Sequence, residues 1–258
     1  MQSVTLGHDE AGSGPLLLLV HGFPFDRRMW AGQLAGLSHL RRVVAVDLRG
    51  RGKSAGLVPD RPSIDAHADD LARTIAALGH DQADVAAQSM GGYIAFALWR
   101  RRPEVVRSLI LINTRAEADS PEARAGRDAS AALVGERGTI ALADQMLPRL
   151  LTPGAGSDIR ALVSQMFEET PADTAAADLL AMRDRPDSTP TLTTISVPAL
   201  VIHGAQDKIV FLQSAGSMAA RIPGGRLVVV PGAGHLSPME NPEAVNAAVA
   251  EFLPGEPS

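Results

Sequence analysis

The amino-acid sequence predicts an α/β fold with a mostly parallel sheet, and two observations lead to this prediction. Short runs of continuously apolar residues, such as residues 16–20 and 43–46, are typical of strands that are buried on both faces. Between such runs lie helical patterns: in residues 64–78 the apolar positions recur at helical spacing, and Gly79 follows them. Strands that alternate with helices along a chain form a parallel sheet with helices on both of its faces.

The expected elements follow this alternation along most of the chain. We expect strands at residues 4–6, 16–20, 43–46, 84–87, 108–112, 199–203 and 227–230, and helices at residues 28–37, 64–78, 93–102, 213–221 and 243–252. Between residues 115 and 190 no strand pattern occurs, and prolines break a segment rich in alanine, leucine and charged residues into four expected short helices. We therefore expect a core made of residues 1–114 and 191–258, with a helical cap at residues 115–190 that acts as a lid.

The composition limits the function classes open to this chain. Its 258 residues are 45% hydrophobic, which is enough for one large domain with a sizeable core. The net charge of −5 and the lack of a long basic run argue against nucleic-acid binding, and no apolar stretch is long enough to span a membrane. The chain has no cysteine, which excludes disulfides and thiolate metal sites. Because no signal-peptide pattern is visible, we expect a cytoplasmic protein.

The stretch Ala86-Ala87-Gln88-Ser89-Met90-Gly91-Gly92 lies between an expected strand and an expected helix. A serine among small residues at such a joint is typical of a nucleophile elbow, a sharp turn whose strained backbone exposes the serine hydroxyl. Bulky side chains two positions before or after the serine would collide with the neighbouring strand and helix. Ala87 and Gly91 stand there; the usual pattern has glycine at both positions, and alanine is a tolerated departure. A plain N-cap serine in a glycine-rich turn is the alternative interpretation of this stretch alone.

Four stretches in one order resemble the α/β-hydrolase superfamily over nearly the whole chain. They are His21-Gly22-Phe23-Pro24, Ala87-Gln88-Ser89-Met90-Gly91, Gly204-Ala205-Gln206-Asp207 and Gly232-Ala233-Gly234-His235. Each follows an expected strand, at the end where open α/β sheets place their sites. The resemblance implies the α/β-hydrolase fold, with an all-helical cap inserted after the sixth strand of the family's sheet. It also implies a catalytic triad in the chain order Ser89, Asp207, His235.

The role of each residue follows from the resemblance and from the chemistry of acyl transfer. Ser89 is the expected nucleophile and His235 the base that removes its proton, while Asp207 orients the imidazole and stabilises its cation. The family's other place for the acid is occupied by Asn113, which cannot carry a negative charge. The family pattern puts the oxyanion hole at the backbone N–H groups of Phe23 and Met90.

A serine nucleophile favours acyl transfer over the chemistry of dehalogenases and epoxide hydrolases of this fold, which use aspartate. We expect a carboxylic-ester hydrolase for small or medium acyl groups; lactonase, perhydrolase or haloperoxidase activity and a slow-turnover ligand receptor are the alternatives. We expect no cofactor and no metal, because no histidine pair has ligand spacing backed by carboxylates. The sequence does not indicate the oligomeric state.

The expected substrate pocket is largely apolar. Its candidate lining residues are Phe25, Met146, Met166, Phe167, Phe211 and Leu236. For the cap residues in this set, packing within the cap itself is the competing interpretation.

Overall fold

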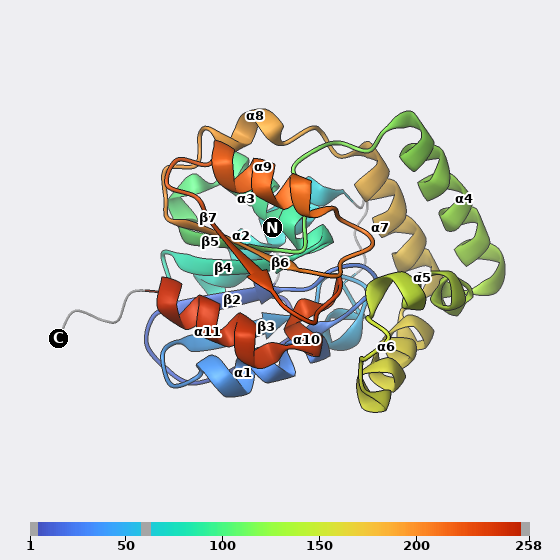
Figure 1. Ribbon diagram of the computed structural model, residues 1–258, viewed down its shortest axis with the longest axis horizontal. Coiled ribbons are helices and arrows are strands. Elements are labelled where there is room, and N and C mark those ends of the chain that lie inside the picture. The colour runs from blue at the N-terminus through green and yellow to red at the C-terminus, as the bar shows by residue number, and fades with distance from the viewer. Residues whose placement is uncertain (1–4, 58–62, 254–258) are drawn as a thin grey trace.

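A twisted sheet lies at the centre of the computed structural model, which describes residues 5–57 and 63–253 (Figure 1). Its strands are β1 (His8–Ala11), β2 (Leu16–Val20), β3 (Arg42–Val46), β4 (Ala83–Gln88), β5 (Val106–Ile112), β6 (Ala199–Gly204) and β7 (Arg226–Val230). They lie in the order β1-β3-β2-β4-β5-β6-β7. Only β1 runs antiparallel to its neighbour, and every other pair in the described sheet is parallel. The prediction of a mostly parallel sheet is confirmed.

Helices cover both faces of the sheet, as the alternation predicts. The helices α1 (Ala31–Leu37) and α11 (Pro242–Phe252) pack together on one face, and α2 (Ile64–Ala77) and α3 (Met90–Arg101) pack together on the other, with α9 (Leu212–Arg221) beside them (Figure 1). Short helical turns are η1 (Arg27–Trp30), η2 (Gly52–Ser54), η3 (Pro103–Val105) and α10 (Ser237–Glu240). No helix in residues 5–57 and 63–253 is both long and apolar enough to cross a membrane.

The interval between β5 and β6 contains helices and no strand, and the structure describes all of it. These helices are α4 (Pro121–Arg137), η4 (Thr139–Leu142), α5 (Ala143–Leu150), α6 (Ser157–Glu169), α7 (Ala172–Asp184) and α8 (Thr189–Leu192). Most of them stand beside one end of the sheet, where α4 packs along α7 (Figure 1). We expected the cap after the sixth strand of the family's sheet. In this chain it follows β5, which is the fifth strand among the described residues.

The first expected strand is wrong in position. Residue 4 lies outside the described residues, and Thr5 and Leu6 do not form a strand. The backbone N–H of Leu6 donates to the Thr74 side chain at 3.1 Å, so side chains of the core take the hydrogen bonds that a neighbouring strand would take. The strand β1 comes later and is polar, because it forms the half-exposed edge of the sheet.

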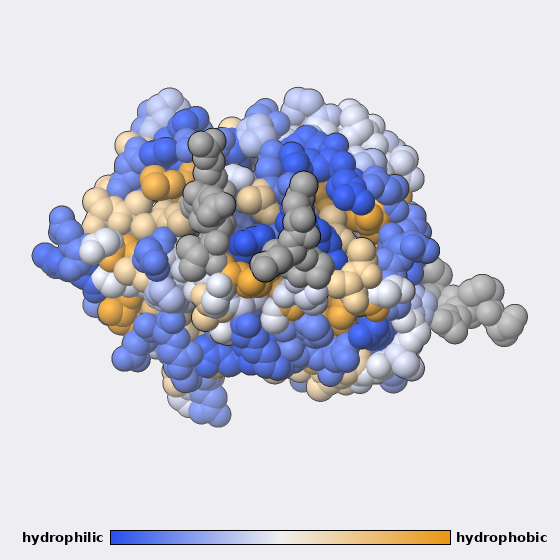
Figure 2. All heavy atoms as spheres, turned by 180° about the vertical axis from the view of Figure 1, so that it is seen from behind, coloured by the Kyte–Doolittle hydropathy of each residue, from blue (hydrophilic) through white to orange (hydrophobic). Residues whose placement is uncertain are grey.

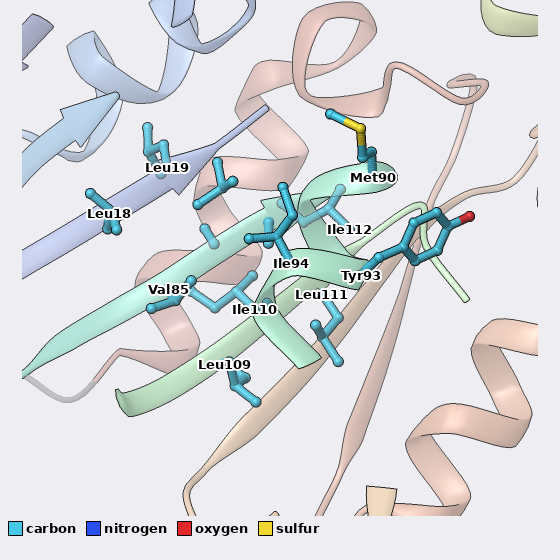
Figure 3. Close-up of a cluster of buried hydrophobic side chains, with 14 of the residues drawn as sticks. Leu18, Leu19, Val85, Met90, Tyr93, Ile94, Leu109, Ile110, Leu111 and Ile112 are labelled. Carbon is cyan, nitrogen blue, oxygen red and sulfur yellow. The ribbon is translucent and has the colours of Figure 1, made fainter. Parts of the chain in front are cut away.

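The hydrophobic core fills both faces of the sheet, and one large part of it lies between the central strands and α3. Figure 3 shows a cluster of hydrophobic side chains from β2, β4, β5 and α3, and all the labelled side chains are buried. Burial of each leucine or isoleucine contributes about 1.5–3 kcal/mol. On the surface seen from behind the view of Figure 1, hydrophilic and hydrophobic residues are intermixed (Figure 2).

His21, directly after β2, ties two strand ends together. Its Nε2 accepts a hydrogen bond from the backbone N–H of Leu48 at 3.0 Å, and its Nδ1 lies 2.9 Å from the Gly22 carbonyl oxygen. A neutral imidazole with its proton on Nδ1 satisfies both contacts. Burial, helped by the positive charge of Arg51, lowers the pKa of His21 from 6.5 to about 4.

Gly91 allows α3 to approach β2 closely, and its replacement tests that contact. A Cβ at this position would lie 2.5 Å from the Val20 carbonyl oxygen, so backbone would have to move. We expect Gly91→Ala to lower the free energy of unfolding by about 2 kcal/mol or more. The exposed Gly135 of α4 has open space around its Cα, and Gly135→Ala should raise stability by up to about 1 kcal/mol. Urea denaturation measures both, and equal effects would show that the close approach is not required.

The neutral state of His21 predicts how the free energy of unfolding depends on pH. The unfolded chain binds this proton near pH 6.5 and the folded chain only near pH 4. The stabilisation is therefore complete above pH 6.5 and is lost as the pH falls towards 4, by an amount on the order of 3 kcal/mol. In His21→Gln this part of the pH dependence should vanish, so the unfolding free energy should fall less between pH 7 and pH 4. Identical slopes for both proteins would contradict the assignment.

Candidate active site

Ser89 occupies the sharp turn between β4 and α3. Its φ of 50° and ψ of −112° lie outside the favoured regions, and only Ser89 and Asn113 have positive φ among the described non-glycine residues. Such a backbone costs about 1–3 kcal/mol and persists only where the surroundings hold it. Here the Ser89 N–H donates to the Ile112 carbonyl at 3.0 Å, and the Thr114 hydroxyl donates to the Ser89 carbonyl at 2.7 Å. The strained turn expected from the sequence is present.

Ser89, His235 and Asp207 form one continuous line of hydrogen bonds. The Ser89 Oγ lies 2.9 Å from His235 Nε2, and His235 Nδ1 lies 2.8 Å from Asp207 Oδ2. An ionised carboxylate only accepts hydrogen bonds, so the imidazole proton is on Nδ1. The lone pair of Nε2 then faces the Ser89 hydroxyl. The side chains of His235 and Asp207 are buried, which keeps water away from this line.

Asp207 is held as an anion by its neighbours. Its Oδ1 accepts from the backbone N–H groups of Ile209 at 2.8 Å and Val210 at 3.0 Å, and Asn113 Nδ2 donates to Oδ2 at 2.8 Å. Burial alone would raise the pKa of this carboxyl, but the charge and hydrogen bond of His235, with the Asn113 and Ile209 bonds, lower it below its usual value. The carboxylate is therefore ready to stabilise a charged imidazole.

Supporting residues that the sequence did not indicate surround this line. Gln88 Nε2 donates to the His235 carbonyl at 2.9 Å, and Glu240 accepts from Gly234 N at 2.9 Å and from Thr152 N at 2.8 Å. The loop that carries His235 is thus fixed to both the elbow and the cap. Asn113, directly after a buried strand, carries one usable signal, since asparagine is enriched at positive φ. Glu240 carries none, because an acidic residue near a helix end is common.

A cavity of about 70 Å³ opens beside the serine and histidine. The residues that line it are Phe23, Ser89, Tyr93, Arg115, Arg127, Met146, Leu150, Met182, Ile209, Val210 and His235. Figure 3 shows the Tyr93 side chain extending away from the aliphatic core. Of the six expected pocket residues, only Met146 lines this cavity. Its wall includes the two arginines, so it is more polar than expected.

The other five expected pocket residues are not among the residues that line this cavity. Phe25 and Phe167 pack edge to face, with ring centroids 5.9 Å apart, and join the cap to the core. Met166 and Leu236 are fully buried in the hydrophobic core, and Phe211 is 70% exposed before α9. Hydrophobicity predicts burial or contact for such residues, but it does not tell which side of a cap helix faces a cavity.

The two residues expected to supply oxyanion donors stand next to Ser89. Phe23 lines the cavity, and a Cβ on the preceding Gly22 would lie 3.1 Å from Ser89 Cβ, so this loop packs against the serine. Met90 is the first residue of α3, where backbone N–H groups have no intrahelical acceptor. The positive end of α3 therefore points at the serine. This arrangement can accept negative charge on an oxygen bonded to the carbon that Ser89 attacks.

Comparisons with known proteins show the family of the chain. A family model described as "Alpha/beta hydrolase family" matches residues 17–248. The structure of a thermophilic esterase from Thermogutta terrifontis, solved with malate bound, is 40% identical, with a TM-score of 0.92 over 96% of this chain and 92% of that chain. The enol-lactonase of Burkholderia xenovorans LB400 is 30% identical, with a TM-score of 0.86 over 96% and 95%. The 3-oxoadipate enol-lactonase 2 of Acinetobacter baylyi is 30% identical over 98% of this chain and 94% of its own length. The chain is therefore a hydrolase that belongs to the alpha/beta hydrolase family.

Proposed function

We propose that this protein hydrolyses carboxylic esters of small or medium acyl groups through an acyl-enzyme formed on Ser89. The observation that carries the proposal is the hydrogen-bond line from Asp207 through His235 to the Ser89 hydroxyl, at the wall of a cavity. Serine is a weak nucleophile until a base removes its proton, and Nε2 of His235 is the base within reach. The similarity to an esterase at 40% identity also supports this class of reaction.

Acylation begins when Ser89 Oγ attacks the carbonyl carbon of the ester. His235 Nε2 takes the hydroxyl proton during the attack, and the negative charge of Asp207 stabilises the imidazolium that forms. The carbonyl oxygen becomes an oxyanion, which the backbone N–H groups of Phe23 and Met90 stabilise. The tetrahedral intermediate then collapses: the bond to the alcohol oxygen breaks, and His235 gives its proton to that oxygen.

Deacylation repeats the sequence with water as the nucleophile. His235 Nε2 removes a proton from the water as its oxygen attacks the acyl carbon, and the same two N–H groups hold the second oxyanion. The bond from the acyl carbon to Ser89 Oγ breaks, and the proton on His235 returns to the serine. The free acid leaves, and the site is restored.

The cap contributes part of the wall of the proposed binding cavity. Met146 and Leu150 come from α5, Met182 from α7 and Arg127 from α4, while the core supplies Ser89 and His235. A second cavity of about 380 Å³ shares Phe23, Arg115, Arg127, Met146 and Ile209 with the first, and its other lining residues all belong to the cap. We infer that the cap, as a lid, limits the length of the acyl group.

A lactone is the second candidate substrate. Attack by Ser89 on a cyclic ester forms the same acyl-enzyme, with the leaving oxygen still attached to the acyl chain. Two similar proteins, at 30% identity, are enol-lactonases. A panel of methyl esters and lactones of matched carbon number distinguishes the two, through the ratio of their kcat/KM values.

Removal of the nucleophile tests the proposal directly. Ser89→Ala should fold normally and lose roughly a million-fold in kcat on any accepted ester, because no other group can form the acyl-enzyme. Ser217→Ala, at an exposed position of α9, is the matched control and should keep full activity. Near-normal hydrolysis by purified Ser89→Ala would show that the assigned nucleophile is wrong.

The role of Asp207 is tested by an isosteric change. Asp207→Asn should keep the fold but lower kcat roughly 10⁴-fold, because the amide favours the wrong imidazole tautomer. The control is Asp81→Asn, an exposed turn residue before β4, at the opposite end of the strand from Ser89. If both variants turn over esters like the parent protein, another group orients His235.

A further inference from the structure

Two arginines line the small cavity beside Ser89. Arg115 and Arg127 are among its lining residues, and none of the described lining residues is acidic. The larger adjoining cavity adds Arg149 and a single acidic residue, Asp119. Its lining therefore carries two positive charges in excess, within a protein whose net charge is −5.

Asp119 cannot neutralise these arginines, because three guanidinium groups share its carboxylate. It accepts hydrogen bonds from Arg115, from Arg127 at 3.1 Å and from Arg185 at 2.9 Å, with its own side chain fully buried. Burial raises the pKa of this carboxyl, but the Arg185 hydrogen bond and the charge of Arg127 lower it to about 2. The group thus counts as one negative charge against three positive charges at neutral pH.

The arginines also have hydrogen-bonding capacity left over. The Nε of Arg115 is buried and has no hydrogen-bond partner among the described residues, and the same holds for Arg185 Nε. Arg185 lies over the Tyr93 ring, 4.0 Å from its centroid, and donates to backbone carbonyls of Met182 and Glu117. The Arg185 guanidinium is therefore engaged in contacts within the fold, whereas Arg115 and Arg127 line the cavity.

A partly buried surplus of positive charge is costly unless an anion completes it. Guanidinium groups match a carboxylate in shape and can donate two parallel hydrogen bonds to it. Since the cavity that holds these arginines also holds Ser89, an anion bound there would belong to the reacting molecule.

We propose that Arg115 and Arg127 form a subsite for a carboxylate of the substrate, so that the preferred substrates are half-esters of short dicarboxylic acids or lactones that bear a carboxylate. This inference rests on the proposed hydrolysis at Ser89. The volume of about 70 Å³ shared by the arginines and the serine suits a chain of a few carbons between the carboxylate and the reacting carbonyl. Uncharged esters leave the positive charge uncompensated and bind less well.

A pair of esters with the same acyl length tests the subsite. Monomethyl glutarate and methyl pentanoate differ by the terminal carboxylate, and their hydrolysis can be followed by titration of the acid released. The parent protein should favour the half-ester by at least about tenfold in kcat/KM, mainly through KM. The corresponding lactone pair is a five-membered lactone with and without a carboxylate substituent. A preference for the uncharged member of both pairs overturns the inference.

Single substitutions assign the preference to residues. Arg127→Gln and Arg115→Gln should each lower kcat/KM for monomethyl glutarate about tenfold or more, while methyl pentanoate changes less than about threefold. Arg124→Gln is the matched control: Arg124 lies on α4 like Arg127, pairs with Asp184 at 3.2 Å and lines neither cavity. If the arginines only anchor the cap, both esters lose activity in equal proportion, and the inference fails. Because the ratio is measured within each variant, a partly destabilised Arg115 variant still gives a clear result, and Arg127→Gln gives an independent one.

Binding measured without turnover separates this inference from the proposed function. Glutarate should bind Ser89→Ala in isothermal titration calorimetry, and Arg127→Gln in the same background should weaken that binding about tenfold. If the parent protein cleaves no ester or lactone but glutarate binds in this manner, the proposed function fails and the subsite stands. If esters are cleaved and glutarate does not bind, the subsite fails and the proposed function stands.

Discussion

The parallel register of the central strands brings the whole candidate site together. Val20 pairs with Ala87, Gln88 with Ile112, Ile112 with Ile202 and Gly204 with Val230, so five strands end at one edge of the sheet. The residues that follow these strands carry the loop with Phe23, the elbow with Ser89, Asn113, Asp207 and His235. No one of these stretches could form the site alone, since hydrogen bonds between strands fix their relative heights.

Strain at two adjacent strand ends is part of this arrangement. Ser89 and Asn113 both have positive φ, and they follow the neighbouring strands β4 and β5. Asn113 donates to Asp207 and to the Gly234 carbonyl, while Thr114 donates to the Ser89 carbonyl. The strained residues thus take part in hydrogen bonds that hold the serine turn, the acid and the loop of the base, which offsets the cost of the strain.

The sequence predicted those features that depend on short stretches of chain. Buried strands, the helix after Ser89 and the elbow at Ser89 have local composition that physical rules can interpret, and family order then pointed to Asp207 and His235. The lining of the pocket was harder to predict, because it is made by residues from several helices, strands and loops. Phe25 and Phe167 were expected there and instead pack against each other, and the meeting of Arg115 with Arg127 depends on how α4 folds back over the loop after β5.

Reaction with a p-nitrophenyl phosphonate measures whether the strand ends create one activated serine. Such a reagent modifies a serine only when a base removes its proton, and mass spectrometry of the intact and digested protein locates the adduct. We expect one adduct per chain, at Ser89, formed at least about 100-fold faster than in His235→Gln. An adduct at another residue, or an equal rate in the histidine variant, would contradict this expectation.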